Sequence, residues 1–263
     1  MYCSKTKTQG RIPDPCRAHS ATFLGHKMYV FGGGDGSTYY NTLYMLDTQN
    51  FSWEKLEVQG TTPGPRRAHT SWSYNGNVYI YAGGDGVKAL DDLYMLKLDE
   101  GDSLICWIKI KTMGKSPRPR GYHTSNLVDD KLVVLGGSDG HECFSDIHVL
   151  DLKTFTWTQS IPNRQIPRLS HSSTIVGSYL FVLCGHDGNN YSNQVLLLNL
   201  KNFTWETKKI LGNFPKQRGY HSAILFDSRI FLFGGYDGSQ VFDDFWALNL
   251  TSSAYLPLVK FNI

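Results

Sequence analysis

The chain has 263 residues, of which 26 are basic and 23 are acidic, so its formal net charge at pH 7 is only +3. Such a balanced charge argues against a dedicated nucleic-acid or membrane surface, because those surfaces need a strong basic excess. No apolar run is long enough to span a membrane, and the first ten residues lack the apolar core of a signal peptide. We therefore expect a cytoplasmic protein with no nucleic-acid partner and no membrane insertion.

A histidine followed by Ser or Thr recurs along the chain and sets the register of an internal repeat. Its copies are His19, His69, His123, His171 and His221, which are 50, 54, 48 and 50 residues apart. Fixed self-similarity at this period is typical of solenoids and propellers.

Each copy continues with four short apolar runs in the same order. The second run ends in a glycine-rich turn with Asp-Gly, which reads FGGGDG at 31–36 and FGGYDG at 233–238. The fourth run carries an aromatic residue, the members being Trp53, Trp107, Trp157, Trp205 and Tyr255. Runs this short predict strands rather than helices. A lone four-stranded sheet cannot bury both faces, so the copies are expected to stack around an axis as the blades of a propeller.

The repeat resembles the kelch repeat over essentially the whole chain. The evidence is the glycine pair, the Asp-Gly turn, the spaced aromatic and the segment Pro117-x-x-Arg120-x-x-His123 before the first strand. The last segment is similar to that of free-standing kelch proteins, such as host cell factor, the Rab9 effector with kelch motifs and fungal cell-end polarity factors. The resemblance implies an all-β kelch β-propeller with five visible four-stranded blades.

We expect one propeller domain over residues 1–263, with approximate repeats 11–60, 61–114, 115–162, 163–212 and 213–263. Residues 3–9 align with Trp53–Gln59 and predict an extra outer strand near the closure seam, within residues 1–10. Tyr255–Phe261 predicts another outer strand. Either end could complete the last blade, or the chain could be part of a longer six-bladed ring; five blades with an irregular seam are favoured.

Loops at one end of each blade are the expected binding face, because loops on a rigid scaffold commonly carry recognition. In an antiparallel meander, the loops between second and third strands share this face with the blade-to-blade connections. The informative positions are those that vary between copies. The resemblance to kelch propellers implies that they line a partner-binding rim, whose candidate members are Arg17, Arg67, Tyr122, Ser138, His186, Tyr220 and Tyr236.

Further loop positions are expected to form an outer ring around this rim. They are Tyr39, Lys88, His141, Tyr191 and Gln240. Some members could instead be packing residues between blades.

The same region holds an arginine that recurs in four copies. These residues are Arg66, Arg120, Arg168 and Arg218, with Cys16 in the first copy, and we interpret them as mainly structural.

The sequence supports a catalytic function less well than a protein-interaction function. Gly136-Gly-Ser138-Asp-Gly140 matches a nucleophile elbow, but that motif needs a strand followed by a helix, and the other four copies lack the serine. Plant specifier proteins, which have a similar fold, use Glu-x-x-x-Asp-x-x-x-His; here Glu142 and Asp146 fit, but position 150 is Leu. The copper ligands and Tyr-Cys crosslink of galactose oxidase cannot be mapped onto the chain.

The chain has five cysteines, which is an odd number, and no Cys-x-x-Cys pair. Neither a disulfide framework nor a zinc site is therefore expected.

We therefore expect a non-catalytic protein-interaction scaffold without a cofactor, in a cytoskeletal or polarity, small-GTPase or ligase-adaptor setting. Its arginines would pair with acidic groups and its tyrosines would pack on apolar or aromatic ones. The alternatives are a metal-dependent kelch-fold enzyme, specifier-like or galactose-oxidase-like, and a filament-binding protein that uses another face. The sequence does not determine the oligomeric state.

Overall fold

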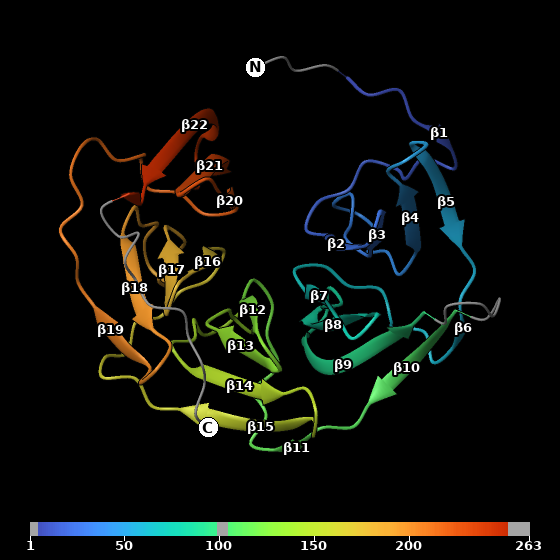
Figure 1. The fold of residues 1–263 in the computed structure, drawn as a ribbon, viewed down its shortest axis with the longest axis horizontal. Coiled ribbons are helices and arrows are strands. Elements are labelled where there is room, and N and C mark those ends of the chain that lie inside the picture. Colours follow the sequence, from blue (N-terminus) through green and yellow to red (C-terminus); the bar gives the residue numbers. More distant parts are fainter. Residues whose placement is uncertain (1–4, 99–104, 252–263) are drawn as a thin grey trace. The chain divides into compact units, whose positions relative to one another are not determined.

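A computed structural model of the chain describes residues 5–98 and 105–251 (Figure 1). The described part is all-β, with five sheets and no α-helix. The chain forms two compact units, residues 1–113 with 118–121 and residues 114–117 with 122–263. Each unit is described by itself.

The first unit contains two sheets, blades 1 and 2, in which four successive strands run antiparallel. Blade 1 consists of β2 (Ser20–Leu24), β3 (Lys27–Phe31), β4 (Leu43–Asp47) and β5 (Ser52–Leu56). Blade 2 consists of β7 (Thr70–Tyr74), β8 (Asn77–Gly84), β9 (Ala89–Lys97) and β10 (Cys106–Ile110). A two-residue strand is added beside the fourth strand of each blade, β1 (Gln9–Gly10) in blade 1 and β6 (Gln59–Gly60) in blade 2.

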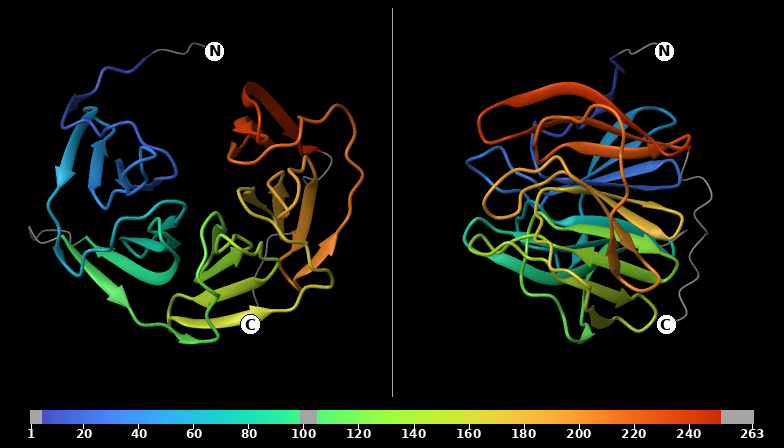
Figure 2. Two further views of the ribbon diagram at one scale, coloured as in Figure 1. Left: turned by 180° about the vertical axis from the view of Figure 1, so that it is seen from behind. Right: turned by 90° about the vertical axis from the view of Figure 1, so that its left-hand side faces the viewer.

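The second unit contains blades 3, 4 and 5, which Figure 2 shows from two further directions. Blade 3 consists of β12 (Thr124–Val128), β13 (Lys131–Leu135), β14 (Ile147–Asp151) and β15 (Thr156–Ser160), with β11 (Met113–Gly114) added. Blade 4 consists of β16 (Ser172–Val176), β17 (Tyr179–Leu183), β18 (Val195–Asn199) and β19 (Thr204–Glu206). The described strands of blade 5 are β20 (Ser222–Phe226), β21 (Arg229–Tyr236) and β22 (Val241–Asn249).

The amino-terminal segment differs from the expected outer strand. Residues 5–8 form no strand, and Gln9 and Gly10 pair in parallel with Ser52 and Trp53 of β5. Gln59 and Gly60 make the same pairing with β10, which explains why the two Gln-Gly pairs align in sequence. The alignment reflects the start of a blade-to-blade connection. Residues 3 and 4 and the predicted strand Tyr255–Phe261 lie outside the described residues.

Neighbouring blades within each unit pack through their first strands and their apolar faces. Contacts join β2 to β7, β12 to β16 and β16 to β20. The repeat histidines bridge these strands, since Nε2 of His69 lies 2.8 Å from Ser20 Oγ and Nε2 of His171 lies 2.9 Å from Thr124 Oγ1. The aromatic of the fourth strand closes the same interface, and Trp107 meets Phe31 edge-on at 5.2 Å between ring centroids. These two repeated residues therefore hold the blades together.

Cys16, Cys106, Cys143 and Cys184 are free thiols. In the described ranges we find no helix that could cross a membrane.

Candidate protein-interaction surface

The Asp-Gly turns are built identically in all five blades. One carboxylate oxygen of each aspartate accepts the backbone N–H groups two and three residues later, as Asp35 does from Ser37 at 2.9 Å and Thr38 at 2.8 Å. The equivalent acceptors are Asp85, Asp139, Asp187 and Asp237. These hydrogen bonds stabilise the ionised form and lower the pKa of each aspartate. The loop tips are therefore rigid turns that carry negative charge at neutral pH.

The predicted rim combines residues just before the repeat histidine, such as Arg17, with residues just before Asp-Gly, such as His186, and these two kinds of position pair through their backbones. In the first blade, Arg17 and Gly34 exchange a pair of backbone hydrogen bonds of 2.9 and 3.0 Å. The same bridge joins Arg67 to Gly84, Leu169 to His186 and Gly219 to Tyr236. A residue of the incoming connection is thereby fixed beside the residue that precedes Asp-Gly.

The residue that precedes the repeat histidine adopts the left-handed conformation in every copy. Its φ lies between 51° and 59° at Ala18, Ala68, Tyr122, Ser170 and Tyr220. Non-glycine residues seldom adopt this conformation, so tertiary contacts must hold it. Backbone hydrogen bonds supply them, from Ala68 N to Ala18 O at 2.8 Å in the first unit, and from Ser170 N to Tyr122 O and Tyr220 N to Ser170 O, both 2.9 Å, in the second.

In the first unit, the two predicted arginines lie on neighbouring blades. The Arg67 guanidinium stacks over the Tyr39 ring at 4.7 Å, so blade 1 orients the arginine of blade 2. Arg17 is exposed, and its guanidinium reaches over Gly36 of its own turn. Within the described residues Arg17 has no acidic partner closer than 4.0 Å. Both cations are available to an acidic group.

Three predicted residues of the second unit bond their own turns. Ser138 Oγ accepts Gly140 N at 3.0 Å, His186 Nδ1 accepts Gly188 N at 3.0 Å, and Tyr236 Oη donates to Gly238 O. His186 therefore has an unprotonated Nδ1, which leaves Nε2 as its N–H donor. These contacts give Ser138, His186 and Tyr236 a structural role in the turn, while Tyr236 keeps 36% of its surface exposed.

Tyr122 and Tyr220 form the clearest aromatic feature of the second unit. Their rings meet edge-on with centroids 5.6 Å apart, although they come from blades 3 and 5. Tyr220 remains 52% exposed, an unusual fraction for an aromatic side chain held by a strained backbone. Exposed, pre-oriented tyrosines are favoured anchors at protein interfaces.

The residues expected to form the outer ring lie on the turns after Asp-Gly, but they are not equivalent positions of these turns. Backbone pairing places Tyr39 opposite Gly34 and Tyr191 opposite His186, but the equivalents in the other copies are Ala89, Cys143 and Val241. Lys88, His141 and Gln240 lie at other turn positions. The turn has the same length in every copy, since the paired position always comes four residues after the aspartate, so these three residues precede the position that Tyr39 and Tyr191 occupy.

Tyr191 packs within the loops of the second unit. Its ring meets His186 edge-on at 4.7 Å and Tyr236 of the next blade at 6.3 Å. Beside it lies an open hollow of about 670 Å³, whose lining includes His186, Asn189, Asn190, Lys216 and Gln217. The last four residues were not predicted, because single polar residues in a loop give no periodic signal.

The recurring arginines are buried, as expected for a structural role. Arg66 is 1% exposed, donates to Ala82 O at 3.0 Å and pairs with Asp92 at 2.6 Å. Arg218, which is fully buried, makes the same pair of contacts with Gly234 O and Asp244. These guanidiniums tie the incoming connection to the third strand of their own blade.

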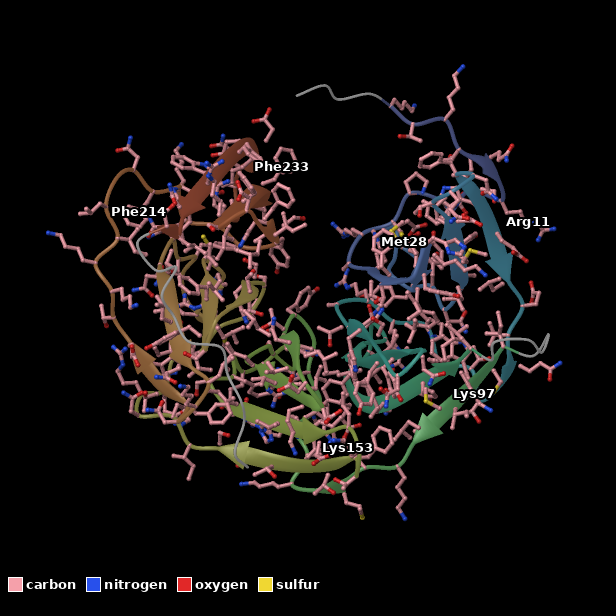
Figure 3. All side chains as sticks on the ribbon, in the orientation of Figure 1. Arg11, Met28, Lys97, Lys153, Phe214 and Phe233 are labelled. Atoms are coloured by element: carbon pink, nitrogen blue, oxygen red, sulfur yellow. The ribbon has the colours of Figure 1, made fainter. Side chains whose placement is uncertain are left out.

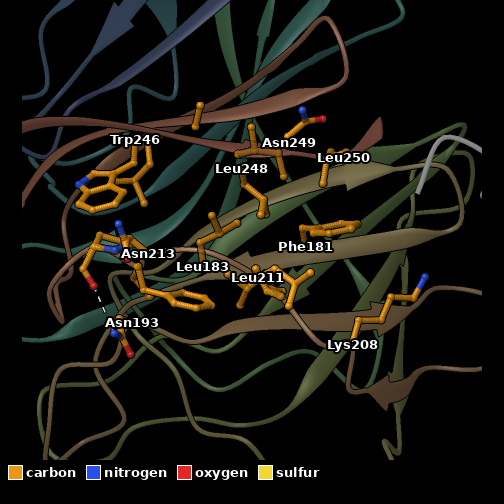
Figure 4. Close-up of a pocket in the computed structure, with 18 of the residues that line it drawn as sticks. Phe181, Leu183, Asn193, Lys208, Leu211, Asn213, Trp246, Leu248, Asn249 and Leu250 are labelled. Atoms are coloured by element: carbon orange, nitrogen blue, oxygen red, sulfur yellow. Dashed lines mark hydrogen bonds between the residues drawn. The ribbon is translucent and has the colours of Figure 1, made fainter. Parts of the chain in front are cut away.

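A second, apolar pocket of about 450 Å³ lies between blades 4 and 5 (Figure 4). Phe181, Leu183, Trp246 and Leu248 line it, and Leu211 and Phe214 of the connection between these blades cover one side. It lies along the sheets and does not include the predicted rim residues.

No group of three His, Cys, Asp or Glu side chains placed to hold a metal ion occurs in the part of the chain that the structure describes. Asp146, which fits part of the specifier motif, pairs instead with His148 at 3.0 Å. Ser138 lies in a β-turn between strands, not in a strand-to-helix elbow.

The KLHDC2/KLHL20/DRC7 Kelch-repeats domain matches residues 1–185 and 160–259 of the chain. The chain belongs to this kelch family. Its five sheets are the blades of a kelch β-propeller, as the resemblance of the repeats implied.

Curated relatives contain similar kelch segments. The chain is 29% identical to "Acyl-CoA-binding domain-containing protein 6" of Oryza sativa subsp. japonica over 56% of this chain and 24% of that protein. It is 32% identical to "Host cell factor" of Drosophila melanogaster over 60% of this chain and 12% of that protein. It is 28% identical to "Kelch domain-containing protein 10" of Rattus norvegicus over 58% of this chain and 40% of that protein. The matches thus span less than half the length of each relative.

Proposed function

We propose that this kelch chain is a non-catalytic interaction scaffold that binds a segment of a partner protein with its loops. The observation that carries the proposal is Tyr220, which is 52% exposed, lies edge-on to Tyr122 and is fixed by a left-handed backbone. A rigid tyrosine loses little conformational entropy on binding and offers both apolar area and a hydroxyl.

Arg67 adds the charged part of the proposed contact. Its guanidinium is held flat on Tyr39 and has no carboxylate within the described residues closer than 4.0 Å, so it can accept a bidentate acidic partner without first breaking an ion pair. The proposed partner therefore presents an acidic group to Arg67 of the first unit or an apolar or aromatic group to Tyr220 of the second. The proposed setting is cytoplasmic and could be cytoskeletal, small-GTPase signalling or substrate choice for a ligase.

The test is a quantitative pull-down from cells with three baits. These are the intact chain, the Arg67→Glu/Tyr220→Ala variant, and an Arg229→Glu/Phe51→Ala control. The control changes the same kinds of side chain at the opposite ends of their blades, Phe51 in a turn and Arg229 at the start of β21. We expect a set of proteins to be lost with the first variant and kept with the control, because charge reversal repels an acidic partner and truncation removes the anchor.

Both variants should first show the melting temperature of the intact chain, so that unfolding cannot explain a loss of partners. Identical partner sets for all three baits would refute binding through these loops. Loss with the control alone would place the contact on the opposite ends of the blades.

A further inference from the structure

One loop position of the repeat carries a tyrosine in two of the blades. Tyr39 in blade 1 and Tyr191 in blade 4 come four residues after the aspartate of their Asp-Gly turns, and each pairs with the residue that precedes that aspartate. Figure 3 shows the side chains of the described residues on the ribbon. The aromatic ring is not required by the fold, because the other blades have Ala89, Cys143 and Val241 at this position.

Each of these tyrosines lies across the Asp-Gly turn of the next blade. A Cβ on Gly86 of blade 2 would lie 3.5 Å from Cε2 of Tyr39. A Cβ on Gly238 of blade 5 would lie 3.3 Å from Cε2 of Tyr191. The glycine of each turn therefore leaves the space that the ring from the preceding blade occupies.

In the first unit, the face of the tyrosine ring holds the residue that we propose to contact a partner. The Arg67 guanidinium stacks over Tyr39 at 4.7 Å, and the residue that follows Arg67 is only an alanine. A cation–π contact depends on the ring face and not on the hydroxyl group. Tyr39 therefore acts on Arg67 through its ring.

In the second unit, the tyrosine hydroxyl takes this role. Gly219 occupies the position of Arg67, and a Cβ on it would lie only 3.1 Å from Cε1 of Tyr191. The ring thus fills the space of a side chain at position 219, and the bulky residue of the pair is Tyr220. Burial raises the pKa of Tyr191, and a hydrogen bond with the Tyr220 side chain opposes this rise. Tyr191 therefore acts on Tyr220 through its hydroxyl group.

We propose that Tyr39 and Tyr191 are positioning residues, which fix the conformations in which Arg67 and Tyr220 meet a partner. The inference rests on the proposed function, in which these two side chains make the contact. A side chain that is free to occupy three staggered rotamers presents the competent one only part of the time, so fixing it before binding raises affinity. The recognition properties of blades 2 and 5 are then set partly by the loop of the blade before each.

The first test measures both contact side chains in the free chain by NMR. Tyr39→Leu removes the ring face, Tyr39→Phe keeps it, and Tyr191→Phe removes only the hydroxyl group. We expect the Arg67 side chain to lose its ring-current shift in Tyr39→Leu and to keep it in Tyr39→Phe. The side-chain couplings of Tyr220 should change from those of a single rotamer to those of an average in Tyr191→Phe.

Tyr179→Phe is the matched control for Tyr191→Phe. It also removes one tyrosine hydroxyl group from blade 4, where Tyr179 Oη donates to Glu206 at 2.8 Å, and it should leave Tyr220 in a single rotamer. Melting temperatures verify that each variant folds.

The second test is the quantitative pull-down with the same variants. Recovery of the partners should fall about threefold with Tyr39→Leu or with Tyr191→Phe, because one of three rotamers remains competent. Recovery should be unchanged with Tyr39→Phe and Tyr179→Phe. This pattern separates positioning from a general loss of stability, since the two equivalent tyrosines respond oppositely to phenylalanine.

An Arg67 side chain that stays ordered in Tyr39→Leu, or a Tyr220 side chain that stays ordered in Tyr191→Phe, would overturn the positioning role. So would full recovery of partners by these two variants when Arg67→Glu/Tyr220→Ala loses them. Full recovery by Arg67→Glu/Tyr220→Ala as well would instead refute the proposed function, and the NMR result would then decide the positioning contacts by itself.

Discussion

Arg168 differs from Arg66 and Arg218 in the partner that its own blade supplies. Arg66 and Arg218 pair with Asp92 and Asp244, but Arg168 meets the amide of Gln194 at 3.0 Å. Arg168 is 3% exposed, and its Nε and Nη1 make no hydrogen bond in the described part of the chain. Burial accordingly lowers the pKa of this guanidinium. Asp187 attracts the guanidinium but offsets only part of the cost of burial, so a carboxylate bonded directly to Arg168 should stabilise blade 4.

Gln194→Asp should therefore stabilise the protein. The new carboxylate would take the position that Asp92 and Asp244 occupy and would neutralise Arg168, which we expect to add about 1–2 kcal/mol to the free energy of unfolding. Urea unfolding at pH 7 measures the difference. Gln194→Ala removes the amide contact and should act in the opposite direction; if the two substitutions destabilise equally, the ion-pair argument fails.

The buried repeat histidines make stability depend on pH. Burial lowers the pKa of His69 and His171 to about 3 and that of His221 to about 4, whereas an unfolded histidine titrates near 6.5. Below about pH 6.5 the unfolded chain therefore binds protons that the folded chain does not. Stability that is fully present above this pH falls as the pH is lowered, by about 1.4 kcal/mol per pH unit for each histidine.

His171→Gln tests this dependence, because glutamine stays neutral and can still donate a hydrogen bond to Thr124. The variant should lose less stability between pH 7.5 and pH 5 than the intact chain, with a slope smaller by about one proton. This window lies above the range in which carboxylates titrate. Parallel pH profiles for the two proteins, measured by urea unfolding, would show that His171 is not the titrating group.

At the scale of the element, the glycine pair after the second strand is fixed by close backbone approach. A Cβ on Gly83 would lie 2.7 Å from Arg67 O and 2.9 Å from His69 Cβ, at a φ of 96°. Gly76, in the turn between β7 and β8, has a φ of 73° but no atom within 4 Å of the same position. Both glycines have a positive φ, but only Gly83 also lacks space for a Cβ, so comparing them separates the cost of the backbone conformation from the cost of a steric clash.

Gly83→Ala should therefore destabilise the protein by about 2 kcal/mol more than Gly76→Ala. Both alanines bear the cost of a positive φ, about 1 kcal/mol, but only the first forces the connection at Arg67 away from its blade. Thermal and urea unfolding compare the two variants directly. Equal destabilisation by the two substitutions would mean that the segment at Arg67 moves away from the new Cβ without a measurable loss of stability.

Sequence periodicity predicts some features of the loops but not others. The aspartate turns were predicted because Asp-Gly recurs with a known chemistry, and the meeting of the rim positions at Arg17 and Gly34 follows from the meander. Lys88, His141 and Gln240, named for the outer ring, precede the paired position that Tyr39 and Tyr191 occupy, although the turn has the same length in every copy. The local bonds of Ser138, His186 and Tyr236 depend on turn geometry that no single-sequence pattern encodes.

At the scale of the whole molecule, the repeats predicted the kelch fold because every copy contributes the same histidine, Asp-Gly turn and spaced aromatic. The two ends were harder to interpret, because they align with parts of a repeat without its core strands. Gln9 and Gly10 matched Gln59 and Gly60 as residues of a connection, and the alignment alone could not distinguish that connection from an outer strand.

The left-handed residue before each repeat histidine has a consequence for protein engineering. Its backbone is the same in all copies, yet its side chain is Ala, Ser or Tyr. A combinatorial library at positions 18, 68, 122, 170 and 220 could therefore rewrite the chemistry of these loops while every strand stays in place. Only some residue types would be allowed at these positions. The positive φ excludes the β-branched residues valine, isoleucine and threonine, and it allows glycine, asparagine and residues with unbranched side chains.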